Sequence, residues 1–303
     1  MTHVAVLMGG QAAERPVSLA TGKACADALE RAGYRVTRID AGPDLVEQLL
    51  AAAPDVVFNA LHGPMGEDGV VQGILEYHKI PYTHSGVLAS ALAMNKDRAK
   101  AVMARAGVPV AEHVSASRFE AAERHLLEPP YVVKPVNEGS SFGILIVRDG
   151  ANRPPAELTG PEWTFTDRVM VEKYVAGHEL TCAVFGDTVY DIIDIVPKAG
   201  SFYGYDAKYQ PGGSEHILPA RLKPNIYQNI QKFTLLAYQA LGCRGVARAD
   251  FRYDPDKDEL VCLEVNTQPG MTETSLVPEM AAHAGVSFEA FVSALVEDAS
   301  CLR

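Results

Sequence analysis

Two polar residues end an apolar, strand-like run in the segment EVNTQPGM at 264–271. Glu264 and Asn266 are two positions apart, so in a strand both side chains point to one face while Val265 points to the other. A carboxylate and an amide oxygen on one rigid face suit a hard cation such as Mg²⁺. Taken alone, however, the segment favours a simpler interpretation, which is a solvated strand end before the Pro-Gly turn.

A second strand-like segment, RGVARAD at 244–250, adds Arg248 and Asp250 on one face. If the two segments pair, Asp250 converges with Glu264 and Asn266, and Arg248 lies beside them. Three oxygen ligands and a guanidinium form the outline of a phosphoryl-transfer site, in which metal ions bridge phosphates and cations offset the developing charge.

The loop NEGSSFG at 137–143 lies between two predicted strands. Its glycines free backbone N–H groups, and Ser140 and Ser141 add hydroxyls, so the loop could cover a phosphate. Lys134 stands just upstream, at the end of the apolar segment YVVKP. A plain Gly/Ser hairpin turn is the alternative, and the sequence leaves both open.

A dinucleotide site is the competing nucleotide interpretation. MGGQAAE at 8–14 follows the first predicted strand, and Asp40 ends the second, where a ribose-binding acid would stand. The fingerprint GxGxxG needs a third glycine, however, and Ala13 or Glu14 occupies its place. The motif GxxxxGK[ST] is also absent, which argues against a Walker-type phosphate loop.

The composition is that of a globular protein of two or three packed units, with 303 residues, 48% hydrophobic and 21% charged. A net charge of −11 argues against a nucleic-acid-binding protein. We expect no membrane segment and a cytoplasmic location, because no apolar run reaches about 18 residues and MTHVAVLMGG lacks signal-peptide features. The five cysteines show no CxxC spacing, which favours buried thiols over a zinc site.

Strand and helix patterns alternate over the first hundred residues, which predicts a parallel sheet covered by helices. We predict strands at 3–8, 34–40, 55–61 and 80–86, and helices at 16–33, 45–52, 69–79 and 95–107. The last of these helices begins a new unit. From 131 onward strands predominate, which predicts an antiparallel α+β arrangement. The strands expected there are 131–135, 144–149, 168–175, 179–186, 188–196, 244–254 and 259–266, with helices at 225–242 and 286–298.

Residues 197–216 read as a long polar loop without periodicity, and such loops in compact chains are usually functional or disordered.

Eight stretches in order along the chain resemble the D-alanine–D-alanine ligase family of the ATP-grasp superfamily. They are LMGGQAAERPVSL, ALHGPMGEDGVVQG, PYTHSGVLASALAMNKDRAK, VVKPVNEGSSFG, VEKYV, FYGYDAKY, ARADF and LEVNTQPGMTETSLVP. Each stretch is weak alone, but eight in this order are specific and cover nearly the whole chain. The resemblance therefore replaces the solvated strand end as the interpretation of EVNTQPGM.

The resemblance implies an ATP-grasp fold in which an N-terminal parallel α/β domain precedes two α+β subdomains that sandwich ATP. We expect these units at 1–95, 96–183 and 184–303. The family joins two D-alanines through an acyl phosphate, with ATP and two Mg²⁺ (or Mn²⁺), for peptidoglycan synthesis. A homodimer is expected, with small-molecule substrates and neither nucleic acid nor membrane as partner.

For the ATP phosphates, the resemblance implies contacts of Lys96 and Lys134 with the α- and β-phosphates and of Lys208 with the γ-phosphate. Ser140 and Ser141 belong to the loop over the phosphates. Lys208 could instead be a solvated loop charge.

For the rest of the nucleotide, Glu172, Lys173 and Val175 would line the adenine pocket, and Glu179 would bind the ribose hydroxyls. The two metal ions would be bound by Asp250, Glu264 and Asn266.

For the amino acids, the resemblance implies that Glu14 anchors the ammonium of the first D-alanine. Arg248 and the N–H of Gly270 would stabilise an oxyanion. Ser275 and the N–H of Leu276 would hold the carboxylate of the second D-alanine. Glu14 could alternatively be an ordinary first-turn acid of a helix.

Ser140 and Tyr209 would join Glu14 in a hydrogen-bonded link that closes the 197–216 loop and excludes water from the acyl phosphate. His62 matches a family histidine near the substrate, although it could equally be a turn residue with satisfied hydrogen bonds.

The chain departs from the family at three positions. The family more often has an acid where Pro16 stands, a serine where Gln268 stands and a histidine where Thr274 stands. None is a metal or phosphate ligand, so the departures concern fine substrate contacts. Two other functions stay open: an ATP-grasp ligase with a different acceptor such as D-lactate, and a non-catalytic nucleotide-binding protein or dinucleotide-dependent oxidoreductase.

Overall fold

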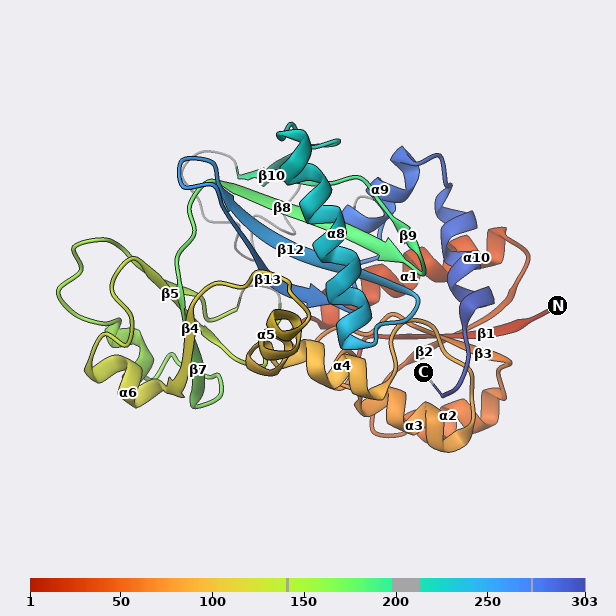
Figure 1. The fold of residues 1–303 in the computed structure, drawn as a ribbon. Coiled ribbons are helices and arrows are strands. Elements are labelled where there is room, and N and C mark those ends of the chain that lie inside the picture. Colours follow the sequence, from red (N-terminus) through yellow and green to blue (C-terminus); the bar gives the residue numbers. More distant parts are fainter. Residues whose placement is uncertain (140–141, 198–212, 274, 303) are drawn as a thin grey trace.

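Three β-sheets with covering helices make up the computed structural model, which describes residues 1–139, 142–197, 213–273 and 275–302. The sheet nearest the N-terminus lies at one end of the molecule, a four-stranded sheet lies at the other, and the largest sheet lies between them (Figure 1).

The N-terminal sheet is parallel, with the strand order β2-β1-β3. Its strands are β1 (His3–Met8), β2 (Arg35–Asp40) and β3 (Val56–Asn59), and its helices are α1 (Arg15–Arg31), α2 (Leu45–Ala52) and α3 (Val70–His78). Alternate side chains of β1 enter different cores: Val4 and Val6 pack with residues of α1 and the C-terminal helices, whereas Ala5 and Leu7 pack with residues of α2 and α3. The predicted parallel sheet is confirmed.

The strand expected at 80–86 is wrong. Only Tyr82 pairs there, through isolated bridges to Val57 and Ser300. The following residues form an unpredicted helix, α4 (Val87–Met94), and α5 (Lys96–Arg105) comes directly after it. Asn95 separates the two helices, and its side chain accepts a hydrogen bond from the N–H of Arg98 as the N-cap of α5.

The central sheet is antiparallel, with the order β11-β10-β8-β12-β13 and β9 paired to β8. Its strands are β8 (His178–Phe185), β9 (Thr188–Val189), β10 (Ile193–Pro197), β11 (Ser214–Ile217), β12 (Val246–Asp254) and β13 (Glu259–Asn266). One face packs on α5 and on α8 (Pro224–Leu241), which runs across the strands in Figure 1. The other face is left for polar residues and for the N-terminal unit.

The third sheet has the order β4-β7-β5-β6 and is also antiparallel. Its elements are β4 (His113–Ser117), α6 (Arg118–Glu123), β5 (Tyr131–Pro135), β6 (Leu145–Val147), the 3₁₀ helix η1 (Ala156–Thr159) and β7 (Arg168–Lys173). Trp163 and Leu158 fill its core beside Tyr131. The α+β arrangement is confirmed, although the sequence reasoning missed β4 and α6.

The expected boundary between 183 and 184 falls inside β8, whose whole length belongs to the central sheet. Helix α5 likewise shares the core of the central sheet, through Ala99 and Met103. The division into three units stays a prediction, and the structure shows that its second boundary crosses a strand.

One further expectation is wrong, and one further helix was not predicted. Residues 214–216 were expected in a loop but belong to β11, which pairs with β10. The segment after the Pro-Gly turn forms an unpredicted helix, α9 (Leu276–His283), before α10 (Phe288–Asp298). The rest of the expected 197–216 loop falls almost entirely in 198–212, outside the described residues.

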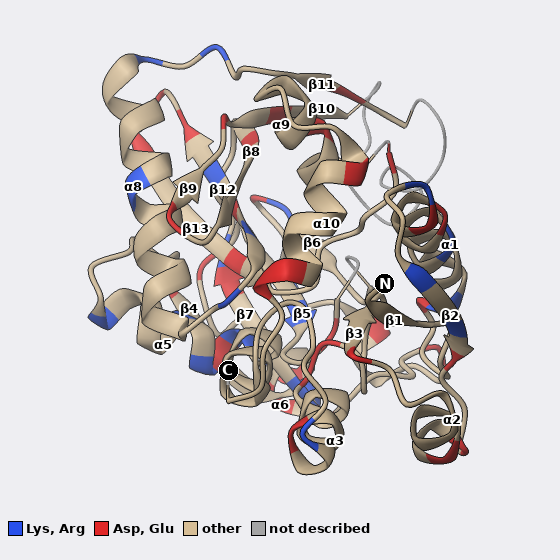
Figure 2. Cartoon of the chain, turned by 90° about the vertical axis from the view of Figure 1, so that its right-hand side faces the viewer, with Lys and Arg blue, Asp and Glu red and all other residues tan. Residues whose placement is uncertain are grey.

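Acidic and basic residues are spread over many elements, including α1, α3 and α10 (Figure 2). Within the described part of the chain, no helix combines the length and the apolar character needed to cross a bilayer.

The packing of α1 on β1 gives a stability prediction. Gly22 lies inside α1, and a Cβ built there would stand 2.4 Å from Cβ of Met8. Gly22→Ala should therefore destabilise the protein by about 1–3 kcal/mol, because overpacking outweighs the gain in helix propensity. Urea unfolding measures the change.

Gly73 is the matched control, because it lies inside α3 with nothing within 4 Å of a built Cβ. Gly73→Ala should stabilise the protein by about 0.5–1 kcal/mol. Equal effects of the two substitutions would contradict the close packing of α1 on β1.

Candidate active site

The facing strands β12 and β13 bring the predicted polar residues together. Asp250 lies opposite Glu264, and Arg248 lies opposite Asn266. The pairing inferred from the sequence is confirmed. Two carboxylates at directly opposed positions repel each other, so this arrangement requires cations nearby.

A β-bulge decides which way Glu264 points. The register shifts between Asp250 and Phe251, so that Phe251 faces Cys262 and Leu263 has no opposite residue. Cys262 is fully buried in the core on the other side of the sheet. Simple alternation would place Cys262 on the same face as Glu264. Because Leu263 is an extra residue in β13, Glu264 instead faces Asp250 while Cys262 faces the core.

Cationic side chains neutralise both carboxylates. Arg248 donates from Nε and Nη2 to the two oxygens of Asp250, at 2.8 Å each. The hydroxyl of Thr181 donates to Oδ1 of Asp250 at 2.7 Å. Nζ of Lys96 lies 3.0 Å from Oε2 of Glu264 and donates to the carbonyl of Glu138 at 2.5 Å.

A cavity of about 400 Å³ lies against this face of the sheet. The predicted site residues that line it are His62, Lys96, Glu179, Arg248, Asp250, Glu264, Asn266, Gly270, Ser275 and Leu276. Lys134 lines a smaller adjoining cavity of about 60 Å³, which shares Lys96, Asp250 and Glu264 with the first. The structure therefore gathers these residues around one space.

The oxygens of Asp250, Glu264 and Asn266 fit a hard cation. All three are oxygen donors, and the two carboxylates stand at opposed positions where added positive charge would relieve their repulsion. Among the described residues, no group of three or more His, Cys, Asp or Glu is placed so that it could hold a metal ion, so the candidate site combines two carboxylates with the amide of Asn266.

Lys134 is held by a buried cluster of three charges. Oε2 of Glu172 lies 2.7 Å from Nζ of Lys134, and its Oε1 lies 2.6 Å from Nζ of Lys100. Lys100 is fully buried and also donates to the carbonyl of Cys262 at 3.1 Å. The cluster ties β5 and β7 of the third sheet to α5 and to β13 of the central sheet.

Burial and neighbouring charges shift the pKa values of this cluster in opposite directions. Burial alone would raise the pKa of Glu172, but Lys134 and Lys100 lower it to about 2. Burial would also lower the pKa of Lys134, but Glu172 and Glu264 raise it. For Lys100 burial dominates, so its pKa is lowered.

On the N-terminal side, Glu14 precedes α1 and is buried. Burial raises the pKa of Glu14, and the neighbouring carboxylates of Glu67 and Glu138 raise it further. Its oxygens approach the glycines of two loops, because Cβ atoms built at Gly63 and Gly139 would stand 2.4 and 3.4 Å from them.

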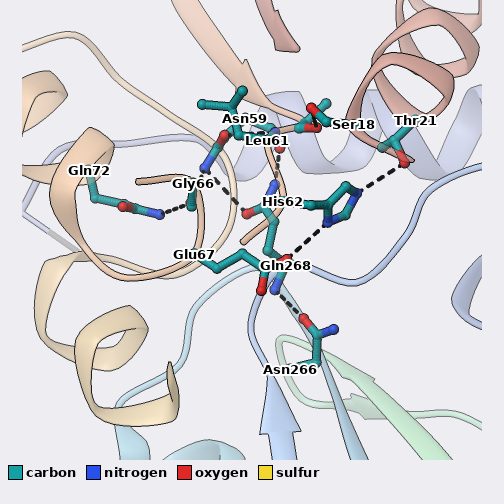
Figure 3. Close-up of polar contacts among 11 residues, drawn as sticks. Ser18, Thr21, Asn59, Leu61, His62, Gly66, Glu67, Gln72, Asn266 and Gln268 are labelled. Carbon is teal, nitrogen blue, oxygen red and sulfur yellow. Dashed lines mark hydrogen bonds and ion pairs between the residues drawn. The ribbon is translucent and has the colours of Figure 1, made fainter. Parts of the chain in front are cut away.

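His62 is bonded through both ring nitrogens. Nε2 lies 3.1 Å from the hydroxyl of Thr21, and Nδ1 lies 2.9 Å from Oε1 of Glu67 (Figure 3). The ring is buried but borders the cavity together with Glu67. Both interpretations of this histidine are therefore compatible with its place: both ring nitrogens have polar partners, and the ring borders the cavity.

The other end of the cavity is formed by the start of α9. Ser275 is the N-cap residue and Leu276 the first residue of the helix. Oγ of Ser275 accepts from the N–H of Thr272 at 3.0 Å and lies near Gly270. The N–H groups at a helix start favour an anion, which suits the expected binding of a carboxylate.

Other predicted residues lie elsewhere. Glu172 and Lys173 are on β7, Val175 is buried just beyond it, and none of the three lines either cavity. Glu179, in contrast, lines both cavities, and its Oε2 lies 3.2 Å from Nη1 of Arg252. Four predicted residues fall outside the described residues: Ser140, Ser141, Lys208 and Tyr209.

Sequence reasoning missed several contributors, among them Lys100, Thr181, Glu67 and Glu138. Lys100 carries a usable signal, because it follows Lys96 by one helical turn and therefore shares its face of α5. Thr181 gives no such signal, since its role depends on the register between β8 and β12.

Two family models match the chain. The model of the D-ala D-ala ligase C-terminus matches residues 102–297, and that of the D-ala D-ala ligase N-terminus matches residues 41–85. The chain belongs to the D-alanine–D-alanine ligase family. Curated relatives agree over the full length: the D-alanine–D-alanine ligase of Methylobacterium radiotolerans is 64% identical and that of Rhizobium meliloti is 60% identical, each covering 99% of both chains.

Solved structures of the D-alanine–D-alanine ligase from Bacillus anthracis are also similar. One of them, complexed with ATP, is 30% identical with a TM-score of 0.80, covering 98% of this chain and 97% of that chain. A second is 32% identical with a TM-score of 0.82 and the same coverage. The ATP-grasp fold implied by the sequence resemblance is confirmed for this member of the ligase family.

The buried cluster gives a stability prediction. Glu172→Gln should destabilise the protein by about 3–5 kcal/mol at pH 7, because it leaves two buried ammonium groups without their carboxylate. Glu259→Gln is the matched control, since its pair with Lys173 at 2.7 Å is partly exposed and should contribute less than about 1 kcal/mol. Urea unfolding of both variants measures the difference.

The same cluster predicts a pH dependence. The folded pKa of Glu172, about 2, lies below its unfolded value of 4.5, so its contribution is full above pH 4.5 and is lost as the pH falls toward 2. Between these limits the stability of Glu172→Gln should fall less steeply than that of the unmodified protein. If the stability of both proteins fell equally steeply over this pH range, the result would contradict the ionised state of Glu172.

Proposed function

We propose that this chain catalyses the ATP-dependent ligation of two D-alanines to D-alanyl-D-alanine, a step of peptidoglycan precursor synthesis. The observation that carries the proposal is the single cavity that joins the carboxylate face of β12 and β13 to His62 on one side and to the start of α9 on the other. The names of the relatives support D-alanine as the substrate. Their high sequence identity over the whole chain supports assigning the same activity to this protein.

ATP would be bound where the two cavities meet. Lys96 and Lys134 line this region and would contact the α- and β-phosphates, with Lys208, Ser140 and Ser141 completing the phosphate site. The ATP-complexed ligase of Bacillus anthracis supports ATP as the nucleotide. Adenine would lie against β7 at Glu172, Lys173 and Val175, and Glu179 would bind the ribose.

Asp250, Glu264 and Asn266 would hold two Mg²⁺ ions, with Mn²⁺ as an alternative. When bound, these ions would offset the charge of the phosphates and polarise the γ-phosphoryl group. Arg248 now forms a two-point contact with Asp250, so its guanidinium is oriented along the same face.

In the first step, the carboxylate of one D-alanine attacks the γ-phosphorus, ADP leaves, and an acyl phosphate forms. Glu14 would anchor the ammonium of this D-alanine, beside His62. Lys96 and Lys134 would offset the charge repulsion between the carboxylate and the phosphates.

In the second step, the amine of another D-alanine, after losing a proton, attacks the acyl carbon, and phosphate leaves. Arg248 and the N–H of Gly270 would stabilise the oxyanion of this step. Ser275 and the N–H of Leu276 would hold the carboxylate of the second D-alanine at the start of α9. Ser140, Tyr209 and Glu14 would link the 197–216 segment over the site and exclude water.

A homodimer and a cytoplasmic location accompany this proposal as expectations from the family resemblance. The alternative acceptor D-lactate stays open as well, and it needs the same phosphoryl-transfer face. A dinucleotide-dependent oxidoreductase is disfavoured by the missing third glycine after β1.

The metal assignment gives a first prediction of activity. Glu264→Gln preserves side-chain volume but removes a charged oxygen, so D-alanine-dependent phosphate release should fall about 10²-fold or more. Glu297→Gln, on the exposed face of α10, is the control and should keep full activity. Normal turnover of Glu264→Gln at ordinary Mg²⁺ concentration would remove Glu264 from the metal-binding set.

Acceptor choice gives a second prediction. The family resemblance implies that members favouring lactate carry a histidine where Tyr209 stands, and a phenol of ordinary pKa, ~10, is neutral at physiological pH. We therefore expect D-alanyl-D-alanine to predominate at pH 7.5 in competition with equimolar D-lactate.

Tyr209→His should increase the share of the ester product as the pH falls toward ~6.5, where the imidazole becomes charged and repels the acceptor ammonium. Mass spectrometry of the products measures both ratios. A majority of ester from the unmodified enzyme at neutral pH would refute the assignment of Tyr209 as the selecting residue.

A further inference from the structure

Three buried amide side chains from distant parts of the chain lie close together (Figure 3). They are Asn59 at the end of β3, Gln72 on α3, and Gln268 just after β13. All three are at most 2% exposed. A buried amide is costly unless it is hydrogen-bonded, so the contacts that these groups form are expected to be specific in geometry.

Gln268 connects the two sides of the cavity. Its side-chain Nε2 donates to the carbonyl of Asn59, and Nδ2 of Asn59 lies 3.5 Å from its Oε1. Its backbone N–H donates to Oδ1 of Asn266 at 2.8 Å. One residue therefore contacts both the candidate metal-binding amide of Asn266 and the end of β3 in the N-terminal sheet.

Asn59 passes this connection to the turn that carries His62. Its Oδ1 accepts from the N–H of Leu61 at 3.1 Å, and its Nδ2 donates to the carbonyl of Gly66 at 3.0 Å. The same carbonyl accepts from Nε2 of Gln72 at 2.8 Å. The turn is also tightly packed, because a Cβ built at Gly66 would stand 2.5 Å from Cβ of Leu61.

The turn in turn fixes two residues of the cavity wall. His62 contacts Glu67 at 2.9 Å and Thr21 of α1 at 3.1 Å. Both His62 and Glu67 line the cavity. Hydrogen bonds therefore run from Asn266, on the phosphoryl-transfer face, to Leu61 and Gly66, and the backbone of the turn completes the connection to His62 and Glu67, on the side proposed for the first D-alanine.

We propose that Gln268 is a positioning residue of the ligase reaction, which through Asn59 and Gly66 holds the His62 turn at a set distance from Asn266. This inference rests on the proposed function. A shorter polar side chain such as serine would lack the reach that Cγ and Cδ give the glutamine amide, so the contact with the carbonyl of Asn59 requires a side chain of this length.

The spacing between the His62 turn and Asn266 should affect the rate of the ligase reaction more than the binding of ATP. ATP would contact residues of the central and third sheets, whereas the connection spans from the central sheet to the N-terminal unit. Loss of the connection should leave the central sheet and the N-terminal unit each intact but should shift one relative to the other. A displacement of about 1 Å can lower the rate about 10²-fold.

The test measures kcat and the apparent KM for ATP by D-alanine-dependent phosphate release. Gln268→Met has nearly the same length but cannot form the hydrogen bonds, so kcat should fall about 10-fold or more while the apparent KM for ATP is unchanged. Gln231→Met is the matched control: it removes a similar bond, from Nε2 to the carbonyl of Tyr190 at 3.2 Å, on α8, and should lower stability without lowering kcat.

A double variant tests whether Asn59 and Gln268 act through one connection or independently of each other. Asn59→Leu and Gln268→Met should each lower kcat, and the double variant should lower it no further than the worse single one, because either change already breaks the connection. Losses that multiply would overturn the proposal. An unchanged kcat in Gln268→Met, together with a loss of stability like that of Gln231→Met, would overturn it as well.

Gln268→Ser keeps the proposal falsifiable if the methionine variant does not fold, because serine is small and polar and is too short to reach the carbonyl of Asn59. We expect this variant to fold and to show a lowered kcat, and a kcat equal to that of the unmodified enzyme would refute the role of Gln268. Absence of D-alanine-dependent phosphate release from the unmodified enzyme would instead overturn the proposed function, and with it this inference.

Discussion

The repulsion between Asp250 and Glu264 is the constraint on which the rest of the site depends. The two carboxylates occupy opposed positions on β12 and β13, where like charges destabilise a sheet. Arg248 and Lys96 offset this repulsion, and each comes from a different place: Arg248 from β12 itself and Lys96 from the first turn of α5. Helix α5 must therefore pack against the central sheet, and its residues Ala99 and Met103 do so in the core on the opposite face from the carboxylates.

Much of this arrangement follows from the amino-acid sequence by simple rules. Alternation of apolar and polar residues indicated β12 and β13, and the shared parity of Arg248 and Asp250 indicated that they face one side. The bulge at Leu263 could not be predicted in this way, because it depends on a register shift between two strands. Without that shift, Cys262 and Glu264 would share a face, and one of them would lie in the wrong environment.

The missed elements have a common physical reason. Helix α2 has eight residues as well and was predicted from its sequence, so length is not the reason. Helix α4 is apolar except for Ser90 and helix α9 contains Pro278, so neither shows a clear polar face, and packing stabilises both helices more than local propensity does. Strand β11 follows a polar stretch and becomes a strand because β10 offers it an edge to pair with. Contacts between distant segments determine these elements, and a single sequence does not display such contacts.

The site is connected to its surroundings by charged groups on one side and by neutral groups on the other. Lys100, Glu172 and Lys134 join the central and third sheets through buried ions, where the proposed partner is a polyphosphate that itself requires cations. Asn59 and Gln268 join the central sheet to the N-terminal unit through amides alone. An acidic group at that second junction would stand beside Asn266 and beside the turn of Glu67, one of the carboxylates that already raise the pKa of Glu14. Neutral amides supply directional hydrogen bonds there without adding to the repulsion, which explains why the two junctions are built from different chemistry.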